Sequence, residues 1–237
     1  TNVNILDQID LISVIKILKK EKPEIIGIPA VSSNFYRVNE LAKKIKKILP
    51  DSILILGGVH VTIFPESFKH SAFDVGVRGE GEISTLHLIN SLEKNKIINL
   101  KELSKSQGFL LKDGNKIINT GLSEQIQNLD ELPFPARDLL NMKYYSLPRF
   151  SAEEDIEPIG SILTSRGCPY SCRFCSSSSF WGRRVRFISA GRVVDEIEFL
   201  YKKYKYKHIY VYDDLFSINK DRLKKIVEGL RKKELLG

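Results

Sequence analysis

Short apolar runs alternate with amphipathic stretches along the first hundred residues. The apolar runs are typical of buried strands, and the stretches between them repeat apolar side chains at the spacing of a helix face. Expected strands span residues 3–6, 25–31, 52–56 and 73–77, and expected helices span residues 11–20, 39–49 and 83–94. This alternation predicts βαβ units and a parallel sheet. We therefore expect a doubly wound α/β domain over residues 1–107, with ligands at the carboxyl ends of its strands.

The pattern changes after this region. Two short apolar runs flank Asp113-Gly114, a dipeptide that favours a tight hairpin turn. The stiff segment Leu132-Pro133-Phe134-Pro135 follows, and an acidic run lies at residues 153–157. Proline and clustered charge are typical of a connecting segment. We expect residues 108–158 to form a hairpin and a linker between two domains.

A second α/β pattern begins at Ile159. Residues 159–164 are an expected strand that leads into a cysteine-rich loop, and Ser189 is a candidate N-cap of the helix that follows. Residues 208–212 form the next expected strand, and residues 221–233 the next helix. Residues 159–237 should therefore hold two βα units, with Asp213 and Asp214 directly after the second strand.

Composition excludes several classes of protein. The chain has 237 residues, of which 42% are hydrophobic and 28% are charged, so it is neither disordered nor fibrous. The net charge of +8 comes largely from lysines scattered along helical faces, which gives no basis for a nucleic-acid partner. No apolar stretch approaches the length of a membrane span, and we expect a cytoplasmic protein without a membrane partner.

The two ends of the chain also bear on function. The chain opens on Thr1 rather than Met and stops at Gly237 directly after a helical pattern. We expect a longer protein of which these residues are the middle, and little or no turnover from the 237 residues alone.

All three cysteines, Cys168, Cys172 and Cys175, lie within eight residues. Thiols packed so closely indicate metal or redox chemistry in a reducing compartment rather than disulfides. Three thiolates suit a 4Fe-4S cluster that keeps one iron open for a ligand. Zinc is the alternative and needs a fourth ligand, for which His208 is the nearest candidate. The spacing alone leaves both metals open.

Arginines are concentrated around the cysteines. Within the 21 residues 166–186 no acidic side chain accompanies the arginines, which are Arg166, Arg173, Arg183, Arg184 and Arg186. Fixed planar cations suit an anionic ligand or cluster. A plain basic surface explains them equally well.

The cysteine spacing, with Phe174 just before the third cysteine, resembles the signature of the radical S-adenosylmethionine (radical SAM) superfamily. Further segments resemble the branch of that superfamily that carries an N-terminal cobalamin-binding domain. These segments are Thr164-Ser-Arg-Gly-Cys-Pro-Tyr, Trp181-Gly182, Arg184-Val-Arg186, Tyr212-Asp213-Asp214-Leu-Phe216, Leu132-Pro-Phe-Pro-Ala-Arg-Asp138, and Gly57-Gly58-Val-His60 followed by Gly79-Glu80-Gly81-Glu82. The likeness spans nearly the whole chain.

The resemblance implies a fold and a mechanism. The fold would be a Rossmann-like cobalamin-binding-type domain followed by the first βα units of a radical SAM partial (β/α) barrel. Cys168, Cys172 and Cys175 would hold the 4Fe-4S cluster, Phe174 would pack near the adenine of S-adenosylmethionine, and Asp213 or Asp214 would meet its ammonium or ribose. Reductive cleavage would give a 5'-deoxyadenosyl radical, for cobalamin-assisted methylation or rearrangement at an unactivated carbon of a small-molecule substrate. An electron donor such as flavodoxin or ferredoxin would be a partner.

Small residues at strand ends are candidates for the cobalamin site, because a corrin needs close approach to the backbone. The candidates are Ser32, Ser33, Gly57, Gly58, Gly79 and Glu80. Ordinary βα turns are the alternative explanation. The Asp-x-His-x-x-Gly motif that supplies a cobalt ligand in other cobalamin proteins is absent, so we expect cobalamin without a protein histidine ligand and no cobalt bond to His60.

Two other functions compete with this one. A radical SAM methylthiotransferase is similar, but such proteins carry further cysteines in the N-terminal domain, and residues 1–167 contain none. A non-catalytic cobalamin- or metal-binding module, or a fragment of an enzyme, is the other alternative.

Overall fold

The computed structural model describes residues 11–142 and 159–236. These residues form two compact units, which we call the first unit (residues 11–126) and the second unit (residues 127–142 and 159–236). The expected strand at residues 3–6 and the acidic run at residues 153–157 lie outside the described residues.

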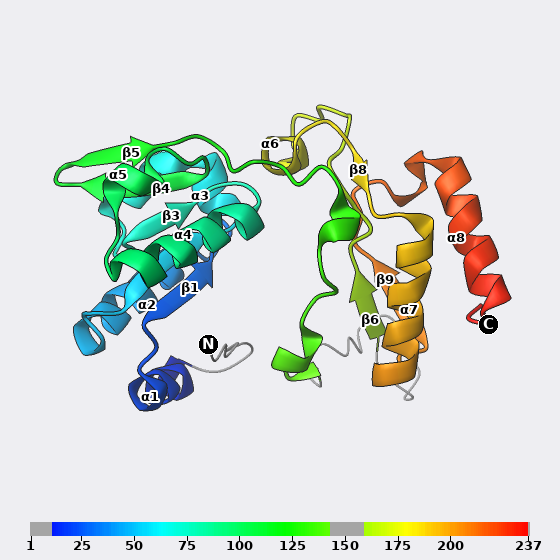
Figure 1. Cartoon of the computed structure of the whole chain (residues 1–237), viewed down its shortest axis with the longest axis horizontal. Coiled ribbons are helices and arrows are strands. Elements are labelled where there is room, and N and C mark those ends of the chain that lie inside the picture. The colour runs from blue at the N-terminus through cyan, green and yellow to red at the C-terminus, as the bar shows by residue number, and fades with distance from the viewer. Residues whose placement is uncertain (1–10, 143–158, 237) are drawn as a thin grey trace. The chain divides into compact units, whose positions relative to one another are not determined.

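A five-stranded sheet forms the centre of the first unit (Figure 1). Its strands, in spatial order, are β1 (Ile25–Pro29), β2 (Ile53–Gly57), β3 (Val75–Val77), β4 (Phe109–Asp113) and β5 (Lys116–Asn119). The first three strands are parallel, and the hairpin of β4 and β5 adds two antiparallel strands beside β3. The parallel strands therefore bring their carboxyl ends to one edge, where α/β folds bind ligands.

Helices cover the two faces of this sheet. Helix α4 (Gly81–Asn95) and the short α5 (Leu100–Leu103) pack on the face that carries Ile55, Val75 and Phe109. Side chains alternate along a strand, so Leu54 and Leu56 point to the opposite face and are fully buried there. The remaining helices are α1 (Leu11–Glu21), α2 (Phe35–Ile48), α3 (Val59–Ile63) and the 3-10 turn η1 (Pro65–His70). In Figure 1, α4 lies in front of the strands and α3 behind them.

The expected α/β class and parallel sheet are confirmed, with two differences in detail. Helix α2 begins at Phe35, one turn before the expected start, because Asn34 Oδ1 accepts from the Val31 amide and closes the preceding turn at 3.0 Å. The hairpin, which we placed in the linker, extends the first sheet because β4 pairs with β3. The division between the two units accordingly falls near residue 126.

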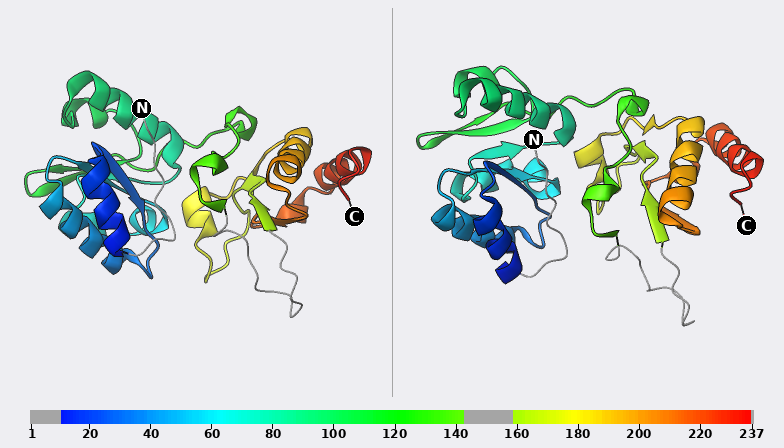
Figure 2. Two further views of the ribbon diagram at one scale, coloured as in Figure 1. Left: turned by 90° about the horizontal axis from the view of Figure 1, so that it is seen from below. Right: turned by 60° about the horizontal axis from the view of Figure 1, so that its bottom comes forward.

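The second unit contains two parallel strands with a helix after each. Strand β6 (Ile159–Ile162) pairs with β9 (His208–Val211), and helices α7 (Ala190–Tyr204) and α8 (Lys220–Lys232) follow them. Ser189 caps α7 as expected, because its hydroxyl accepts from the Arg192 amide at 3.4 Å. Both views of Figure 2 show α7 and α8 side by side, and Lys233 Nζ reaches Asp195 at 2.8 Å. Their shared core contains Val194, Ile226 and Leu230.

A buried ion pair fixes the segment that precedes the second unit's strands. Arg137 lies in the 3-10 turn η3 (Arg137–Leu139), and one guanidinium nitrogen donates to Glu196 at 2.8 Å and to the Ser161 carbonyl at 2.8 Å. Both charged side chains are at least nine-tenths buried. The segment is therefore anchored to β6 and α7 of the same unit. Among the described residues no helix is long and apolar enough to cross a bilayer.

Candidate functional site

The cysteine loop leaves the carboxyl end of β6 and is closed at its base. A two-residue strand β7 (Ser165–Arg166) enters the loop and pairs with β8 (Arg186–Phe187), which leaves it. The Cys168 amide donates to the Gly182 carbonyl at 3.3 Å. Gly167 has a positive φ of 99°, and a Cβ there would lie 2.3 Å from the Arg184 carbonyl oxygen. Only glycine fits this position, so the start of the motif is held tightly against the chain that returns to β8.

The thiols occupy an accessible position on this loop. Cys172 and Cys175 are exposed, Cys168 is half-buried, and all three are free thiols. The Ser177 amide donates to the Cys175 sulfur at 3.5 Å. Within residues 11–142 and 159–236 no three His, Cys, Asp or Glu side chains lie close enough together to hold a metal ion. The donor set nevertheless fits an iron-sulfur cluster, since three free thiols on one eight-residue loop are what such a group requires.

His208 lies at the wrong end of the strands to complete a zinc site. It is the first residue of β9 and pairs with Ile159, the first residue of β6. The cysteine loop follows the carboxyl end of β6, at the opposite end of these parallel strands. The alternative of a zinc ion held by the three thiols and His208 is therefore disfavoured by the strand register.

Phe174 is 93% exposed, so it is not a core residue. An exposed aromatic ring between two exposed cysteines has no packing role in this unit. Core packing therefore does not explain the aromatic residue at this position.

The two aspartates after β9 have different surroundings. Asp213 accepts four hydrogen bonds, from the amides of Thr164 and Ser165 at 2.5 and 3.2 Å and from their hydroxyls at 2.6 Å each. Its carboxylate is therefore occupied in fastening β9 to the start of the loop. Asp214 is exposed and accepts from the Ser177 hydroxyl in α6 (Ser177–Trp181), which directly follows the cysteines. Of these two aspartates, Asp214 is the one with an exposed carboxylate, and it contacts the helix that follows the cysteines.

Arg222 is a residue of this region that the sequence did not single out. It is 7% exposed, and its guanidinium donates to the carbonyls of Thr164 at 2.9 Å and Ile188 at 2.8 Å. Thr164 and Ser165, the donors to Asp213, were also missed as functional residues. Hydroxyl side chains at a strand end, directly before a cysteine-rich loop, are the signal that could have identified them.

The glycines at the end of β2 lie against the end of β1. The Ala30 amide donates to the Gly57 carbonyl at 2.9 Å, and a Cβ on Gly58 would lie 2.7 Å from the Ala30 carbonyl oxygen. Gly58 also has φ 91° and ψ −173°, a region that is essentially closed to other residues. A Cβ on Gly57, in contrast, would meet nothing within 4 Å. At the end of β2, the backbone conformation therefore requires glycine at position 58, whereas Gly57 borders open space.

The other strand-end candidates divide into open and buried positions. Ser32 and Ser33 are exposed, and the Ser32 hydroxyl lies 3.0 Å from His60 Nδ1. Gly79 has a φ of 81°, and its amide donates to the Thr62 hydroxyl at 2.9 Å. Glu80 is only 3% exposed, so its carboxylate lies inside the fold rather than on the rim where we expected it.

Substitutions at Gly57 and Gly58 should distinguish a glycine that the backbone requires from a glycine that only borders open space. We expect Gly58→Ala to destabilise the first unit by on the order of 3 kcal/mol, because both its backbone angles and its contact with Ala30 exclude a Cβ. Gly57→Ala should change stability by less than about 1 kcal/mol. Thermal denaturation followed by circular dichroism measures both. Equal destabilisation by the two variants would contradict this account of the strand end.

His60 is enclosed by aromatic rings beside these glycines. Its ring stacks on Phe35 with centroids 4.0 Å apart, Phe64 lies 5.5 Å away, and Nε2 is buried without a hydrogen-bond partner. Burial lowers the pKa of His60, and Glu66 opposes this effect. Burial thus disfavours the protonated form of this imidazole, which packs against both aromatic rings.

The lowered pKa of His60 predicts a pH dependence of stability. An unfolded histidine titrates near about pH 6.5, so below that value the unfolded chain binds more protons than the folded one. The first unit should therefore lose stability as pH falls from about 7 toward 5. Melting temperatures of the wild type and of His60→Asn, measured across this range, should converge at low pH. Parallel profiles for the two proteins would show that His60 is not responsible.

The fold and the cysteine loop define a class of protein, one in which a Rossmann-like α/β domain precedes βα units with a thiol-rich loop at the first strand end. Residues 2–89 match the model of the B12 binding domain, and residues 162–235 match the model of the radical SAM superfamily. The chain belongs to the radical SAM superfamily, in the branch that carries an N-terminal B12-binding domain.

Individual relatives agree with this assignment. The chain is 39% identical over 209 residues to an uncharacterized methyltransferase of Pyrococcus horikoshii, a match that covers 87% of this chain and 43% of the relative. It is 30% identical over 217 residues to the anaerobic magnesium-protoporphyrin IX monomethyl ester cyclase of Cereibacter sphaeroides, covering 89% of this chain and 33% of the cyclase. The chain thus spans less than half the length of these relatives.

A solved structure shares the fold. The cobalamin-dependent S-adenosylmethionine radical enzyme OxsB, solved with aqua-cobalamin and S-adenosylmethionine bound, aligns with a TM-score of 0.76 at 24% identity. The alignment covers 95% of this chain and 31% of OxsB. The two family-model matches confirm both expected domain types, and this structure shares the fold.

Proposed function

We propose that this chain is part of a cobalamin-dependent radical SAM enzyme that methylates an unactivated carbon of a small molecule. One observation carries the proposal: a loop with three free thiols leaves a βα-unit strand in the same chain as a B12-type sheet with an open strand end. The matched relative named as a methyltransferase supports methyl transfer as the outcome. Three accessible thiols also support a reducing, cytoplasmic location.

In the second unit, Cys168, Cys172 and Cys175 are the residues that would hold a 4Fe-4S cluster. The cluster, when bound, supplies the electron that cleaves S-adenosylmethionine and generates a radical. Phe174 is free to cover an adenine ring, because no residue of its own unit packs over it. Asp214 is the carboxylate available to an ammonium or ribose hydroxyl, while Asp213 keeps β9 and the loop start in register.

In the first unit, the end of β2 is the proposed seat of the corrin. Gly57 leaves open space above the strand end, and Gly58 lets the next turn lie directly on Ala30. Ser32 and Ser33 are exposed at the neighbouring end of β1 and can donate hydrogen bonds to a bound cofactor. His60 lies between Phe35 and Phe64, and we do not place it among the residues that would hold the cofactor.

A cobalamin titration tests the role of the first unit. The folded chain should retain hydroxocobalamin through gel filtration, with about one cobalamin per chain. Gly57→Val should reduce the affinity at least roughly tenfold, since a side chain there fills the proposed seat. Gly27→Val is the matched control, because Gly27 is also a strand glycine with nothing within 4 Å of an added Cβ but lies in the middle of β1.

Two outcomes would count against the cobalamin site. A folded wild-type chain that elutes without hydroxocobalamin would contradict cobalamin binding by this unit. Equal losses in Gly57→Val and Gly27→Val would contradict the placement of the corrin at the end of β2.

A further inference from the structure

A hollow with an apolar wall opens beside the cysteine loop of the second unit. Its volume is about 550 Å³, within the roughly 300 to 1,000 Å³ that is common for small-molecule sites. The apolar residues that line it are Pro169, Val185, Phe187 and Ile218. Pro169 follows Cys168 directly, so the hollow borders the loop that carries the thiols. Neither the cluster ligands nor the proposed seat of the corrin includes these residues.

A buried arginine holds the aromatic part of this wall in place. The guanidinium carbon of Arg222 lies 5.1 Å from the centre of the Phe187 ring, and its nitrogens donate to the Thr164 and Ile188 carbonyls. The backbone of Phe187 is fixed as well, because it pairs with Ser165 between β7 and β8. Phe187 therefore offers a preformed apolar surface on which a planar ring can stack.

Two cations and a carboxylate also line the hollow. The cations are Arg183 and Lys220, and Asp221 is the acidic residue. All three side chains are exposed, and the ion pairs recorded for the described residues involve none of them. Lys202 and Lys233 of the same unit are, in contrast, paired with carboxylates of α7. The charges at the hollow are thus available to a ligand.

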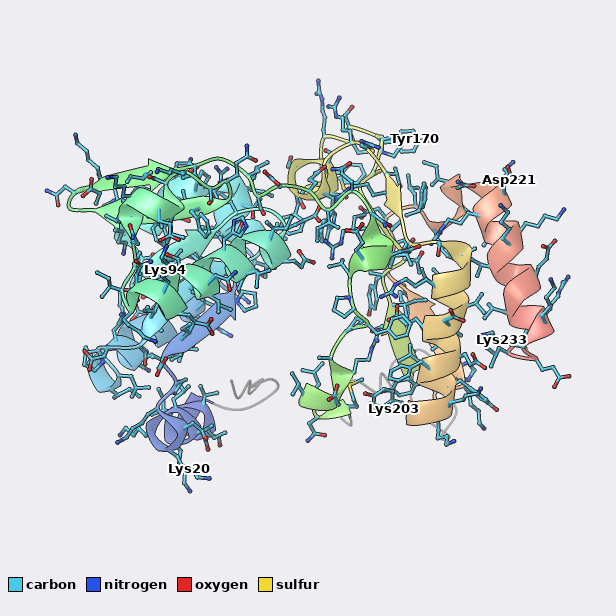
Figure 3. The ribbon with its side chains drawn as sticks, viewed as in Figure 1. Lys20, Lys94, Tyr170, Lys203, Asp221 and Lys233 are labelled. Atoms are coloured by element: carbon cyan, nitrogen blue, oxygen red, sulfur yellow. The ribbon has the colours of Figure 1, made fainter. Side chains whose placement is uncertain are left out.

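These charged residues come from two segments that are far apart in the sequence. Arg183 lies on the segment that returns from the cysteine loop, where the preceding Gly182 carbonyl accepts from the Cys168 amide at 3.3 Å. Lys220 and Asp221 are the first two residues of α8. Figure 3 labels Asp221 and Tyr170 of the cysteine loop, and both lie at the same end of the second unit. The fold therefore gathers the apolar wall, the cations and the carboxylate at one place.

We propose that this hollow binds a mononucleotide, an inference that does not depend on the proposed function. The base stacks on the wall that contains Phe187, and the phosphate meets Arg183 and Lys220. A planar guanidinium matches the oxygens of a phosphate, and the lysine adds a second positive charge. Asp221 accepts a hydrogen bond from a ribose hydroxyl, because an ionised carboxylate is an acceptor only. Each part of a nucleotide thus has a matching side chain in the hollow.

Simpler anions match the hollow less well. Inorganic phosphate would leave the apolar wall without a partner, and burial of apolar surface is a main source of affinity in such sites. An apolar carboxylic acid without a sugar would bring a second negative charge near Asp221 and give this carboxylate no donor. The combination of wall, cations and acceptor therefore favours a nucleotide over either class.

The first test is a titration of the cluster-free chain with etheno-AMP, an AMP whose adenine is made fluorescent. Fluorescence anisotropy should show saturable binding at about one site per chain. AMP should displace this probe at least roughly tenfold more effectively than adenosine, which lacks the phosphate, and than inorganic phosphate, which lacks the base. Absence of saturable binding, or displacement by adenosine or by inorganic phosphate as effective as that by AMP, would overturn the proposal.

A pair of charge-removing variants places the site. Arg183→Gln with Lys220→Gln should raise the Kd for etheno-AMP at least roughly tenfold, because the phosphate loses both cations. The matched control is Lys225→Gln with Lys232→Gln, which removes the same charge from two exposed lysines farther along α8. The control should stay within about twofold of the wild type, and melting temperatures check that both variants fold. Wild-type affinity in the first variant, or an equal loss in the control, would overturn the placement in the hollow.

Asp221→Ala tests the ribose contact and does not depend on the fold of the other variants. The wild type should bind AMP roughly fivefold more tightly than an AMP analogue that lacks both ribose hydroxyls, since the analogue leaves the carboxylate without its donor. Asp221→Ala should bind the two about equally. The same preference in the wild type and in Asp221→Ala would overturn the role of Asp221.

S-adenosylmethionine distinguishes this hollow from the site of the proposed reaction. It shares the nucleoside of AMP but carries no phosphate, so it should displace etheno-AMP no better than adenosine does. Displacement as effective as that by AMP would show that the hollow belongs to the S-adenosylmethionine site, and would overturn the assignment of a separate nucleotide site.

Discussion

Replacement of any one of Cys168, Cys172 and Cys175 by alanine should abolish assembly of a 4Fe-4S cluster in this chain. Each remaining pair of thiols is too few for a cluster that needs three protein ligands to stay bound with one iron open. The loss should be complete rather than graded, because no group of three His, Cys, Asp or Glu side chains in the described part of the chain lies close enough together to offer a replacement ligand set. Iron content and the visible absorption of the reconstituted protein measure it.

Stability should change little in at least two of these variants. Cys172 and Cys175 are exposed, so their removal leaves no cavity in the second unit. Ser171→Ala, an exposed change within the same loop, is the control and should assemble the cluster like the wild type. Full iron incorporation by any cysteine variant, or loss of iron in Ser171→Ala, would contradict the assignment of the three thiols as the ligands.

Asp213→Ala should destabilise the second unit by on the order of 4 kcal/mol, because four donors of Thr164 and Ser165 lose their charged acceptor. Asp213→Asn should cost less, about 1 to 2 kcal/mol, since one amide oxygen can still accept from the two backbone amides. Urea unfolding followed by tryptophan fluorescence measures this unit selectively, because the chain's single tryptophan, Trp181, lies within it.

Asp214→Asn is the matched control for Asp213. Asp214 is exposed and contacts only the Ser177 side chain among its recorded bonds, so its substitution should leave the unfolding curve nearly unchanged. The same change should weaken S-adenosylmethionine binding to the reconstituted protein if Asp214 meets the ligand's ammonium. Strong destabilisation by Asp214→Asn, with none by Asp213→Ala, would reverse the roles assigned to the two aspartates.

The sequence predicted the longer helices and most strands of both units, because hydrophobic periodicity and helix-breaking residues agree along the chain, but it did not predict short elements such as α3, α6, β7 and β8. Buried runs such as residues 52–56 and capping residues such as Ser189 are local signals, and the structure confirms both. It did not predict that the hairpin joins the first sheet, because pairing of β4 with β3 depends on contacts between distant residues. Local turn chemistry fixes a hairpin but does not say which strand lies beside it.

Some residues of the candidate site were predicted from the sequence and others were not. The cysteine spacing identified the loop. The different surroundings of Asp213 and Asp214 were not predicted, because they depend on Thr164 and Ser165, which lie about fifty residues earlier in the chain and reach Asp213 only because β6 pairs with β9. Glu80 had the right position in the sequence for a ligand rim but is buried in the structure. Residue type and position at a strand end therefore predict where a site lies. The direction in which each side chain points becomes known only from the folded structure.

The central claim is that the three thiols hold a 4Fe-4S cluster with one iron open to S-adenosylmethionine. The most direct measurement is electron paramagnetic resonance of the chain after anaerobic reconstitution with iron and sulfide and reduction with dithionite. We predict about four irons per chain and a reduced-cluster signal that changes when S-adenosylmethionine is added, since the open iron gains a ligand. A colourless protein with stoichiometric zinc, or a cluster signal indifferent to S-adenosylmethionine, would contradict the claim.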